Sequence, residues 1–226
     1  MRQKPKNKAK APVKRNPDKT REKIFSCSFE RFAKYGFYGT TLDEILKKAK
    51  VNKRMVYHYF GSKEGLYREI HLEGWRTLQD HFFKFLTEPG HANPKELENT
   101  GEVLLAVIRL FHRFTAEHFK FQRLATWDAL EGGKVTKSLW KEIREPLFKY
   151  CLLLVEGAQE QGYIHKDLNP NQLLISITGM VTFYFIFENS LDDMIGKDPL
   201  SEKALQEREE ELVKMCRKLM KNPDEK

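Results

Sequence analysis

The chain has 226 residues, 40% of them hydrophobic, and a formal net charge of +8. This length and composition allow a substantial buried core, which excludes a disulfide-stabilised miniprotein. The sequence shows no apolar run of about 18 residues and no apolar stretch behind its charged first residues, which predicts a cytoplasmic protein without a membrane span or secretory signal. Its three cysteines, Cys27, Cys151 and Cys216, are far apart and are expected to be reduced core residues.

Positive charge is concentrated in the first quarter of the chain. Residues 1–63 contain 18 Lys and Arg against 5 Asp and Glu, a net charge of +13, whereas residues 64–226 contain 22 against 27, a net charge of −5. A basic segment on a mildly acidic body is typical of a protein that binds a polyanion. Residues 1–19 are too polar to form a core and are predicted to be a disordered basic arm, or a solubilising tail. Residues 20–63 have the pattern of a folded segment and still carry +6, which favours a nucleic-acid partner.

From Thr20 onward, apolar residues recur with helical spacing and strand-like alternation is nearly absent. We therefore predict an all-α fold. Polar residues that begin helices mark several of the starts: Thr41 with Glu44 forms a capping box, and Asn52, Ser62, Asn93, Asn169 and Ser201 are expected N-caps. The predicted helices cover residues 20–35, 42–49, 53–60, 63–87, a helix from Asn93-Pro94 through Phe114, 119–131, 136–161, 169–190 and 201–221.

The first three predicted helices suggest a DNA-binding motif. Residues 42–49 and 53–60 are short helices joined by a tight turn, with residues 20–35 available to pack against them, which is the arrangement of a helix-turn-helix. The major groove of B-DNA is about 12 Å wide and admits one helix, whose first residues need long hydrogen-bond donors. Lys53 and Arg54 occupy that first turn.

The stretch from Thr20 to Tyr67, most closely TTLDEILKKAKVNKRMVYHYFGSKEGLY, resembles the DNA-binding head of the TetR family of bacterial transcriptional regulators. The resemblance implies that Arg54 reads base edges while Lys63 holds a phosphate, although Lys53 could take the base instead. Lys50 stands where many members have glycine, and Asn52 stands near where many have Ser or Thr. The predicted DNA-binding residues are Thr41, Asn52, Lys53, Arg54, Tyr57, His58, Tyr59 and Lys63.

The resemblance also implies a second domain that binds an effector and dimerises. We expect a basic arm over residues 1–19, a DNA-binding domain over 20–65 and a helical effector-binding and dimerisation domain over 66–226. Aromatic residues that could line an effector pocket, or else fill the core, are Trp75, Phe82, Phe111, Phe114, Phe121 and Trp127. Helices 136–161 and 169–190 are expected to form the dimer interface, unless their apolar residues are buried within one protomer; the candidates are Leu147, Leu154, Leu173, Ile177 and Phe185.

Other chemical readings of the sequence are weaker. Residues 163–172 resemble the catalytic loop of protein kinases, but Gln172 stands where that loop needs Asn, and the other kinase motifs are absent from the sequence, so a turn between helices is expected. The histidines form no HxxxH pair, and neither a metal nor another cofactor is predicted. Residues 201–221 mix acids and bases as on a solvated amphipathic helix rather than on a membrane surface.

Together these features predict a homodimeric, non-enzymatic transcriptional regulator. It is expected to repress transcription from a pseudo-palindromic DNA operator and to be released by a small, largely apolar effector. The alternatives are a transcriptional activator of the same fold and a nonspecific architectural DNA-binding protein. An enzyme is disfavoured because the sequence shows no catalytic motif at a readable spacing.

Overall fold

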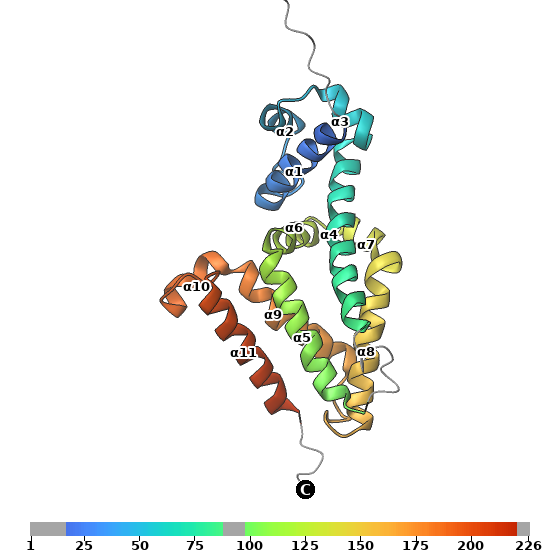
Figure 1. Cartoon of the computed structure of the whole chain (residues 1–226), viewed down its shortest axis with the longest axis vertical. Coiled ribbons are helices and arrows are strands. Elements are labelled where there is room, and N and C mark those ends of the chain that lie inside the picture. The colour runs from blue at the N-terminus through green and yellow to red at the C-terminus, as the bar shows by residue number, and fades with distance from the viewer. Residues whose placement is uncertain (1–16, 88–97, 221–226) are drawn as a thin grey trace, which may run out of the picture.

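A computed structural model describes residues 17–87 and 98–220 (Figure 1). All regular secondary structure in these two ranges is helical, which confirms the predicted all-α class. Among these residues no single helix is long and apolar enough to cross a membrane; α9 and α10 meet that test only as a pair, and they are bent by 86° where they join. The helices are α1 (Pro17–Tyr35), α2 (Leu42–Ala49), α3 (Lys53–Phe60), α4 (Lys63–Leu86), α5 (Thr100–Glu117), α6 (Phe119–Leu130), α7 (Lys134–Ser138), a π-helical segment (Trp140–Arg144), α8 (Glu145–Glu160), α9 (Pro170–Ile186), α10 (Glu188–Ile195) and α11 (Glu202–Leu219).

Side-chain caps fix most of the predicted helix starts. The hydroxyl of Ser62 accepts a hydrogen bond from the backbone N–H of Gly65 at 3.0 Å, and the side chain of Asn169 accepts one from Gln172 at 3.1 Å. Each cap satisfies an N–H group that the first helical turn leaves without an intrahelical partner. The predicted caps at Thr41, Asn52, Ser62 and Asn169 are confirmed.

One other predicted start is wrong, and one correctly placed start lacks the expected cap hydrogen bond. The helix that runs through Leu104 begins at Thr100, with Asn99 as its N-cap, so the cap of this helix is not Asn93, which lies outside the described residues. Ser201 occupies the N-cap position of α11, but its hydroxyl donates to the carbonyl oxygen of Asp198 at 2.7 Å and makes no cap hydrogen bond. Asn and Ser are common in turns as well as at caps, so residue type alone does not place a cap.

The two long helices predicted near the C-terminus are interrupted. In place of one helix over 136–161, the chain forms α7, the π-helical segment and α8, and Pro146 stands in the first turn of α8, where its missing N–H is tolerated. In place of one helix over 169–190, α9 ends at Ile186. The predicted disordered arm is also too long, because α1 already begins at Pro17; its residues 1–16 lie outside the described residues.

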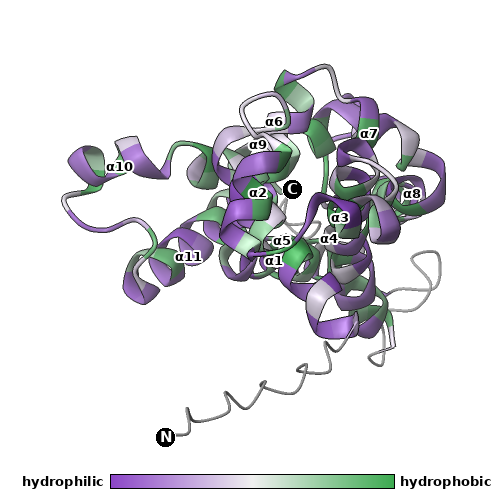
Figure 2. Cartoon of the chain, turned by 90° about the horizontal axis from the view of Figure 1, so that it is seen from above, coloured by the Kyte–Doolittle hydropathy of each residue, from purple (hydrophilic) through white to green (hydrophobic). Residues whose placement is uncertain are grey.

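The molecule is elongated, and the head formed by α1, α2 and α3 lies at one end of its long axis (Figure 1). Helix α4 leaves the head and continues into a body built from α5, α8 and α9, while α6 lies beneath the head and packs against α1. Seen from the head end, α10 and α11 extend to one side of the body (Figure 2). The predicted domain boundary at residues 65 and 66 falls inside α4, so the head and the body share one helix.

Helix α11 is attached to the body by buried apolar residues and by ion pairs with α5, among them those of Glu209. Leu212 and Cys216 join the body core. Arg113 of α5 donates two hydrogen bonds to Glu209, from Nε at 2.7 Å and from a terminal nitrogen at 2.8 Å, and Arg109 lies 3.6 Å from the same carboxylate. Burial raises the pKa of Glu209, but the neighbouring arginines and His112 outweigh this effect and the pKa is lowered. Helix α11 is therefore docked on the body and keeps one solvated face.

Helices α4 and α6 pack tightly against each other at Gly74. A methyl group on Gly74 would lie 2.2 Å from ring carbons of Phe121. We expect Gly74→Ala to lower the free energy of unfolding by about 1–3 kcal/mol through overpacking, which exceeds the gain of about 1 kcal/mol in helix propensity. Urea denaturation measures this change. Adding Phe121→Leu should recover part of the loss, whereas a Gly74→Ala variant more stable than wild type would contradict this close packing.

Candidate nucleic-acid interface and effector pocket

The turn between α2 and α3 has the short, sharp geometry of a helix-turn-helix. Lys50 ends α2 in the left-handed conformation with φ of +54°, and its N–H donates to the carbonyl of Leu46. Among the described residues Lys50 is the only one other than glycine with a positive φ. The left-handed region disfavours residues that carry a Cβ, so this turn stores strain at the position where many TetR proteins have glycine.

Helix α3 presents four polar side chains on one outward face. Asn52 caps the helix by accepting a hydrogen bond from the N–H of Arg54 at 2.9 Å. Val56 and Phe60 are buried in the core of the head. The opposite face of α3 is exposed, and its residues follow one another at intervals of one and three residues, as expected for one face of a helix. These exposed residues are Lys53, Arg54, Tyr57 and His58.

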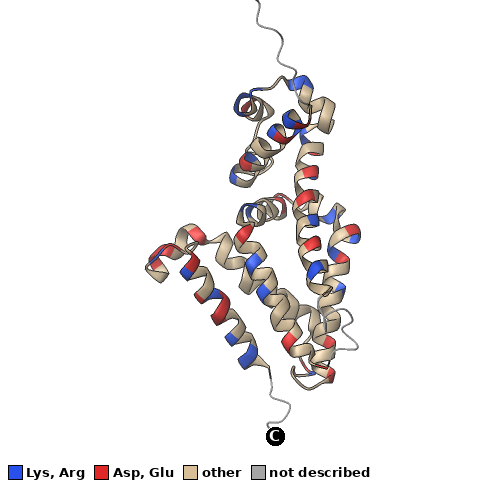
Figure 3. Ribbon diagram, viewed as in Figure 1, with Lys and Arg blue, Asp and Glu red and all other residues tan. Residues whose placement is uncertain are grey.

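Lys53 and Arg54 are available to an external ligand. In the part of the chain that the structure describes, neither side chain has an ion-pair or hydrogen-bond partner. Figure 3 shows Lys and Arg on the outer end of the head, around α2 and the start of α3. The positive end of the α3 dipole adds to this field, so the first turn of α3 favours an anion.

Three other predicted DNA-binding residues are engaged within the head. The Thr41 hydroxyl donates to Glu44 at 2.8 Å and also accepts from the Glu44 N–H, which completes the capping box. Hydrogen bonds from Thr41, together with Arg31, lower the pKa of Glu44 to about 2. The Tyr59 hydroxyl donates to the carbonyl of Pro17 at 3.2 Å and so connects α3 to the start of α1.

Lys63 is the third engaged residue. Its ammonium group donates to the carbonyl of Phe37 at 2.6 Å and lies 4.0 Å from the centre of the Phe37 ring. Burial lowers the pKa of Lys63, partly opposed by Glu64 and Glu131. A contact with phosphate would use the remaining donors of this ammonium group, because one of its three is directed at Phe37.

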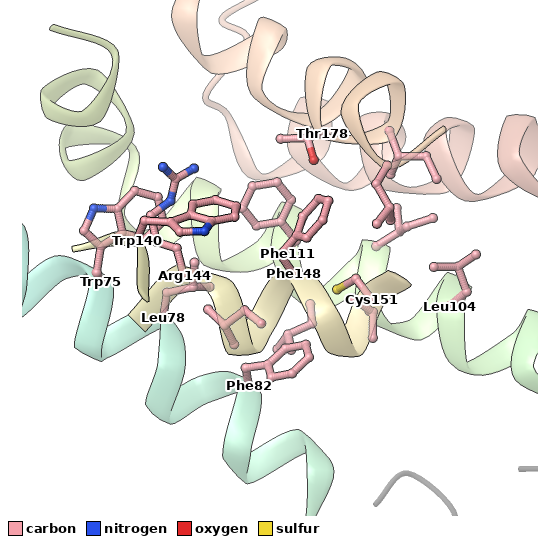
Figure 4. Close-up of a pocket in the computed structure, with 16 residues that line it drawn as sticks. Trp75, Leu78, Phe82, Leu104, Phe111, Trp140, Arg144, Phe148, Cys151 and Thr178 are labelled. Atoms are coloured by element: carbon pink, nitrogen blue, oxygen red, sulfur yellow. The ribbon is translucent and has the colours of Figure 1, made fainter. Parts of the chain in front are cut away.

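An apolar pocket lies in the body, about 180 Å³ in volume, between α4, α5, the π-helical segment, α8 and α9 (Figure 4). Three of the six predicted pocket residues line it: Trp75, Phe82 and Phe111. Its remaining lining residues, which the sequence pattern did not single out for a pocket, are Leu78, Leu104, Val107, Ile108, Leu110, Trp140, Arg144, Leu147, Phe148, Cys151, Leu174, Ile177 and Thr178.

The other predicted pocket residues lie elsewhere. Phe114 and Phe121 are buried between α4, α5 and α6, where they belong to the core that the head shares with α6, and they line only a small hollow next to α1. Trp127 lies against Gly36 at the contact between α6 and the head. The helical spacing of these three residues correctly predicts that they face the interior, but it does not show which helix each of them packs against.

The predicted dimer-interface residues divide into two groups. Leu154 and Phe185 are fully enclosed in the core of a single protomer, so they do not belong to an outer surface. Leu147, Leu173 and Ile177 are partly buried against the same core, and Leu147 and Ile177 also line the pocket. For Leu154 and Phe185, the structure therefore shows the alternative to a dimer interface, which is burial within one protomer.

The fold brings together one set of metal-binding residue types. The ligand atoms of His81, Glu117 and His118 lie within 4.8 Å of one another. His81 Nδ1 is 2.7 Å from the carbonyl of Thr77, so this nitrogen donates and leaves Nε2 with its lone pair. Three such ligands plus water could hold a divalent ion. A search for HxxxH spacing misses this set because His81 lies on α4 and the other two residues lie where α5 ends.

The geometry defines a helix-turn-helix DNA-binding regulator with a pocket in its second domain. Residues 24–70 match the family model for bacterial regulatory proteins of the tetR family, and residues 101–216 match the model for tetracyclin repressor-like C-terminal domains. The chain therefore belongs to the TetR family of helix-turn-helix transcriptional regulators, which is not a family of enzymes.

Individual relatives agree with this assignment. The chain is 26% identical to the HTH-type transcriptional repressor SCO4008 of Streptomyces coelicolor over 183 residues, which cover 80% of this chain and 86% of the relative. It is 40% identical to the HTH-type transcriptional regulator RutR of Escherichia coli over 176 residues, which cover 76% and 77%. A solved structure of the Streptomyces coelicolor protein SCO4942 shares the fold, with a TM-score of 0.62, 22% identity and coverage of 89% of this chain and 98% of that chain.

Arg54 and Lys63 should differ in what their removal does to DNA binding. We expect Arg54→Ala to cost about 1–3 kcal/mol per half-site on the preferred sequence and to relax the preference at one base pair, because a guanidinium reads guanine through two hydrogen bonds. Lys63→Ala should weaken binding to preferred and random DNA alike, because a phosphate contact carries no sequence information. Binding-site selection with each variant measures both effects, and an unchanged motif for Arg54→Ala would refute the assignment.

Proposed function

We propose that this protein is a repressor that binds a pseudo-palindromic operator as a homodimer and is released from it by a small, largely apolar effector. The observation that carries the DNA-binding part is the exposed face of α3, where Lys53 and Arg54 have no partner among the described residues. A relative with a similar chain length, SCO4008, is named a repressor, which favours repression over activation. Its name says nothing about the effector.

The position of the pocket supports release by an effector. Trp75, Leu78 and Phe82 of α4 form one wall of the pocket, while the first turns of the same helix hold Leu66 and Ile70 in the core of the head. A ligand that moved this wall would therefore shift the helix on which α3 rests. Because a ligand shifts an equilibrium only by its differential affinity for two states, the effector has to bind the released arrangement more tightly.

A DNA-binding measurement tests the main proposal. A duplex selected from a random library should bind about 10³-fold or more tightly than a scrambled duplex at the same salt concentration. Transcription in vitro from a promoter that contains the selected site should then fall when the protein is added. Equal affinity for both duplexes would indicate an architectural DNA-binding protein, and increased transcription would indicate an activator.

Effector binding has a natural optical signal. Two of the three tryptophans of the chain, Trp75 and Trp140, line the pocket. A compact apolar compound that enters the pocket should change tryptophan fluorescence and, at the same concentrations, reduce operator binding. A compound that changes the fluorescence but leaves operator binding intact would separate the pocket from regulation.

The dimer is proposed to form through the outer face of α9 and the adjoining α10. That face exposes large apolar side chains which the protomer itself leaves uncovered: Ile175, Phe183, Ile186, Phe187, Met194 and Ile195. Phe183, Met194 and Ile195 border one surface hollow, and exposed apolar surface of this kind marks an interaction site. It continues the predicted interface helix 169–190 but uses its outward residues, in place of Leu154 and Phe185.

We expect Phe183→Glu to convert the dimer to a monomer at micromolar concentration, because a charge in a dry interface costs several kcal/mol. Sedimentation velocity measures the oligomeric state, and affinity for the two-half-site operator should fall with it. Phe83→Glu is a matched control, since Phe83 is exposed to a similar extent, 47% against 52% for Phe183, but lies on α4. A wild-type monomer, or equal effects of both substitutions, would contradict this interface.

A further inference from the structure

The pocket contains one charged side chain. Of the residues that line it, only Arg144 carries a charge; the other polar groups of the lining side chains are the Cys151 thiol, the Thr178 hydroxyl and the indole N–H groups of Trp75 and Trp140. Its guanidinium carbon lies 4.6 Å from the centre of the Trp75 ring and 5.2 Å from that of Trp140. Figure 4 shows the guanidinium beside these two rings, at one end of the pocket. A cation has therefore been placed at the end of an otherwise apolar pocket.

Arg144 lacks an acceptor within the described part of the chain. Burial lowers its pKa, and the carboxylate of Asp128 only partly opposes this effect. Asp128 is not within ion-pair distance, and its two oxygens accept hydrogen bonds from the backbone N–H groups of Val135 at 3.3 Å and Thr136 at 2.9 Å. The charge of Arg144 is balanced by aromatic faces and not by an anion.

The other half-buried arginines show that this is unusual for the protein. Every other arginine of the described residues with intermediate exposure has a carboxylate or carbonyl acceptor: Arg21 has Glu69, Arg31 has Glu44, Arg109 has Glu209, Arg123 has Glu188, and Arg208 has the carbonyl of Met180. Guanidinium groups removed from water require such partners, because an unpaired donor loses its hydrogen bonds to solvent.

We propose that the effector is an apolar monocarboxylate whose carboxylate pairs with Arg144 while its hydrocarbon body fills the pocket. The inference rests on the proposed function, since it names the chemical class of ligand for the same pocket. The planar fork of a guanidinium matches a carboxylate through two parallel hydrogen bonds. A phosphate group would bring about two negative charges to a site that offers one cation, so a carboxylate fits better.

The volume of the pocket limits the size of the apolar part. A cavity of 150 Å³ lined by apolar side chains accommodates benzene, and this pocket has about 180 Å³. A substituted aromatic ring, or a chain of about eight carbons, is the corresponding body. Burial raises the pKa of the Cys151 thiol in the same wall to about 12, which disfavours its nucleophilic thiolate form, so the ligand is expected to bind reversibly.

A matched pair of probes tests the proposal. Octanoate and 1-octanol have the same chain length and differ in the charge of the head group. By isothermal titration calorimetry with the wild-type protein at pH 7.5, octanoate should bind about tenfold or more tightly than 1-octanol, as expected for a charge-assisted hydrogen bond. In Arg144→Met this preference should disappear, while the affinity for 1-octanol stays within about threefold. Lys141→Met removes an exposed cation three residues away and should leave the preference unchanged.

The outcomes separate this inference from the proposed function. If wild-type protein binds its operator and is released by 1-octanol as readily as by octanoate, the pocket is an effector site, but the proposal that the effector carries a carboxylate is wrong. If octanoate binds preferentially but never affects operator binding, the pocket binds a carboxylate at Arg144, but the proposed release of the protein from DNA by an effector is wrong. If Arg144→Met does not fold, the comparison of the two probes on wild-type protein still decides, since equal affinities or no binding of octanoate would overturn the proposal.

Discussion

The structure depends on one helix that belongs to two hydrophobic cores. Helix α4 has 24 residues and is therefore about 36 Å long. Its first half contributes Leu66 and Ile70 to the core of the head, and its second half contributes Phe82 and Phe85 to the core of the body. Packed cores resist small continuous deformation, so α4 is a rigid connection between the surroundings of Phe82 and the head.

Several polar contacts hold the head on α6 and α4, and two of them meet at the turn after α1. The carboxylate of Glu131, at the end of α6, accepts hydrogen bonds from the backbone N–H groups of Phe37 at 3.1 Å and Tyr38 at 3.2 Å, while Lys63 of α4 donates to the carbonyl of Phe37. Gly36 makes this approach possible: its φ is +70°, and a Cβ there would lie 2.6 Å from Glu131 and 2.9 Å from Trp127. The turn after α1 therefore contacts both α4, which lines the pocket, and the end of α6.

Local signals made the head predictable, and long-range packing made the body less so. A capping box such as Thr41 with Glu44, or a cap such as Asn52, acts within four residues, so the sequence alone shows it. Other features depend on which helices meet, and the periodicity of one helix does not encode this. They are the break at the π-helical segment, the burial of Leu154 and Phe185, and the convergence of His81 with His118. The same limit explains why only half of the residues predicted from aromatic spacing line the pocket. It also explains why the sequence does not predict a role for Arg144, because a charged residue in an amphipathic stretch cannot be told from a solvated one until its neighbours are known.

The position of Arg144 links the chemistry of the pocket to the helix that carries the head. Its guanidinium stacks on Trp75, which lies on α4, and on Trp140, which precedes it in the π-helical segment. A carboxylate that paired with Arg144 would bind in the plane of the guanidinium, which leaves the faces of that group free to stay against the indole rings. Occupation of the pocket would then connect the ligand to α4 through Trp75, while the hydrocarbon body pressed on Leu78 and Phe82 of the same helix. Since α4 begins at Lys63, next to α3, the proposed effect needs no relay through other elements: Trp75, about halfway along α4, and the first turn of that helix are joined by a single run of backbone hydrogen bonds.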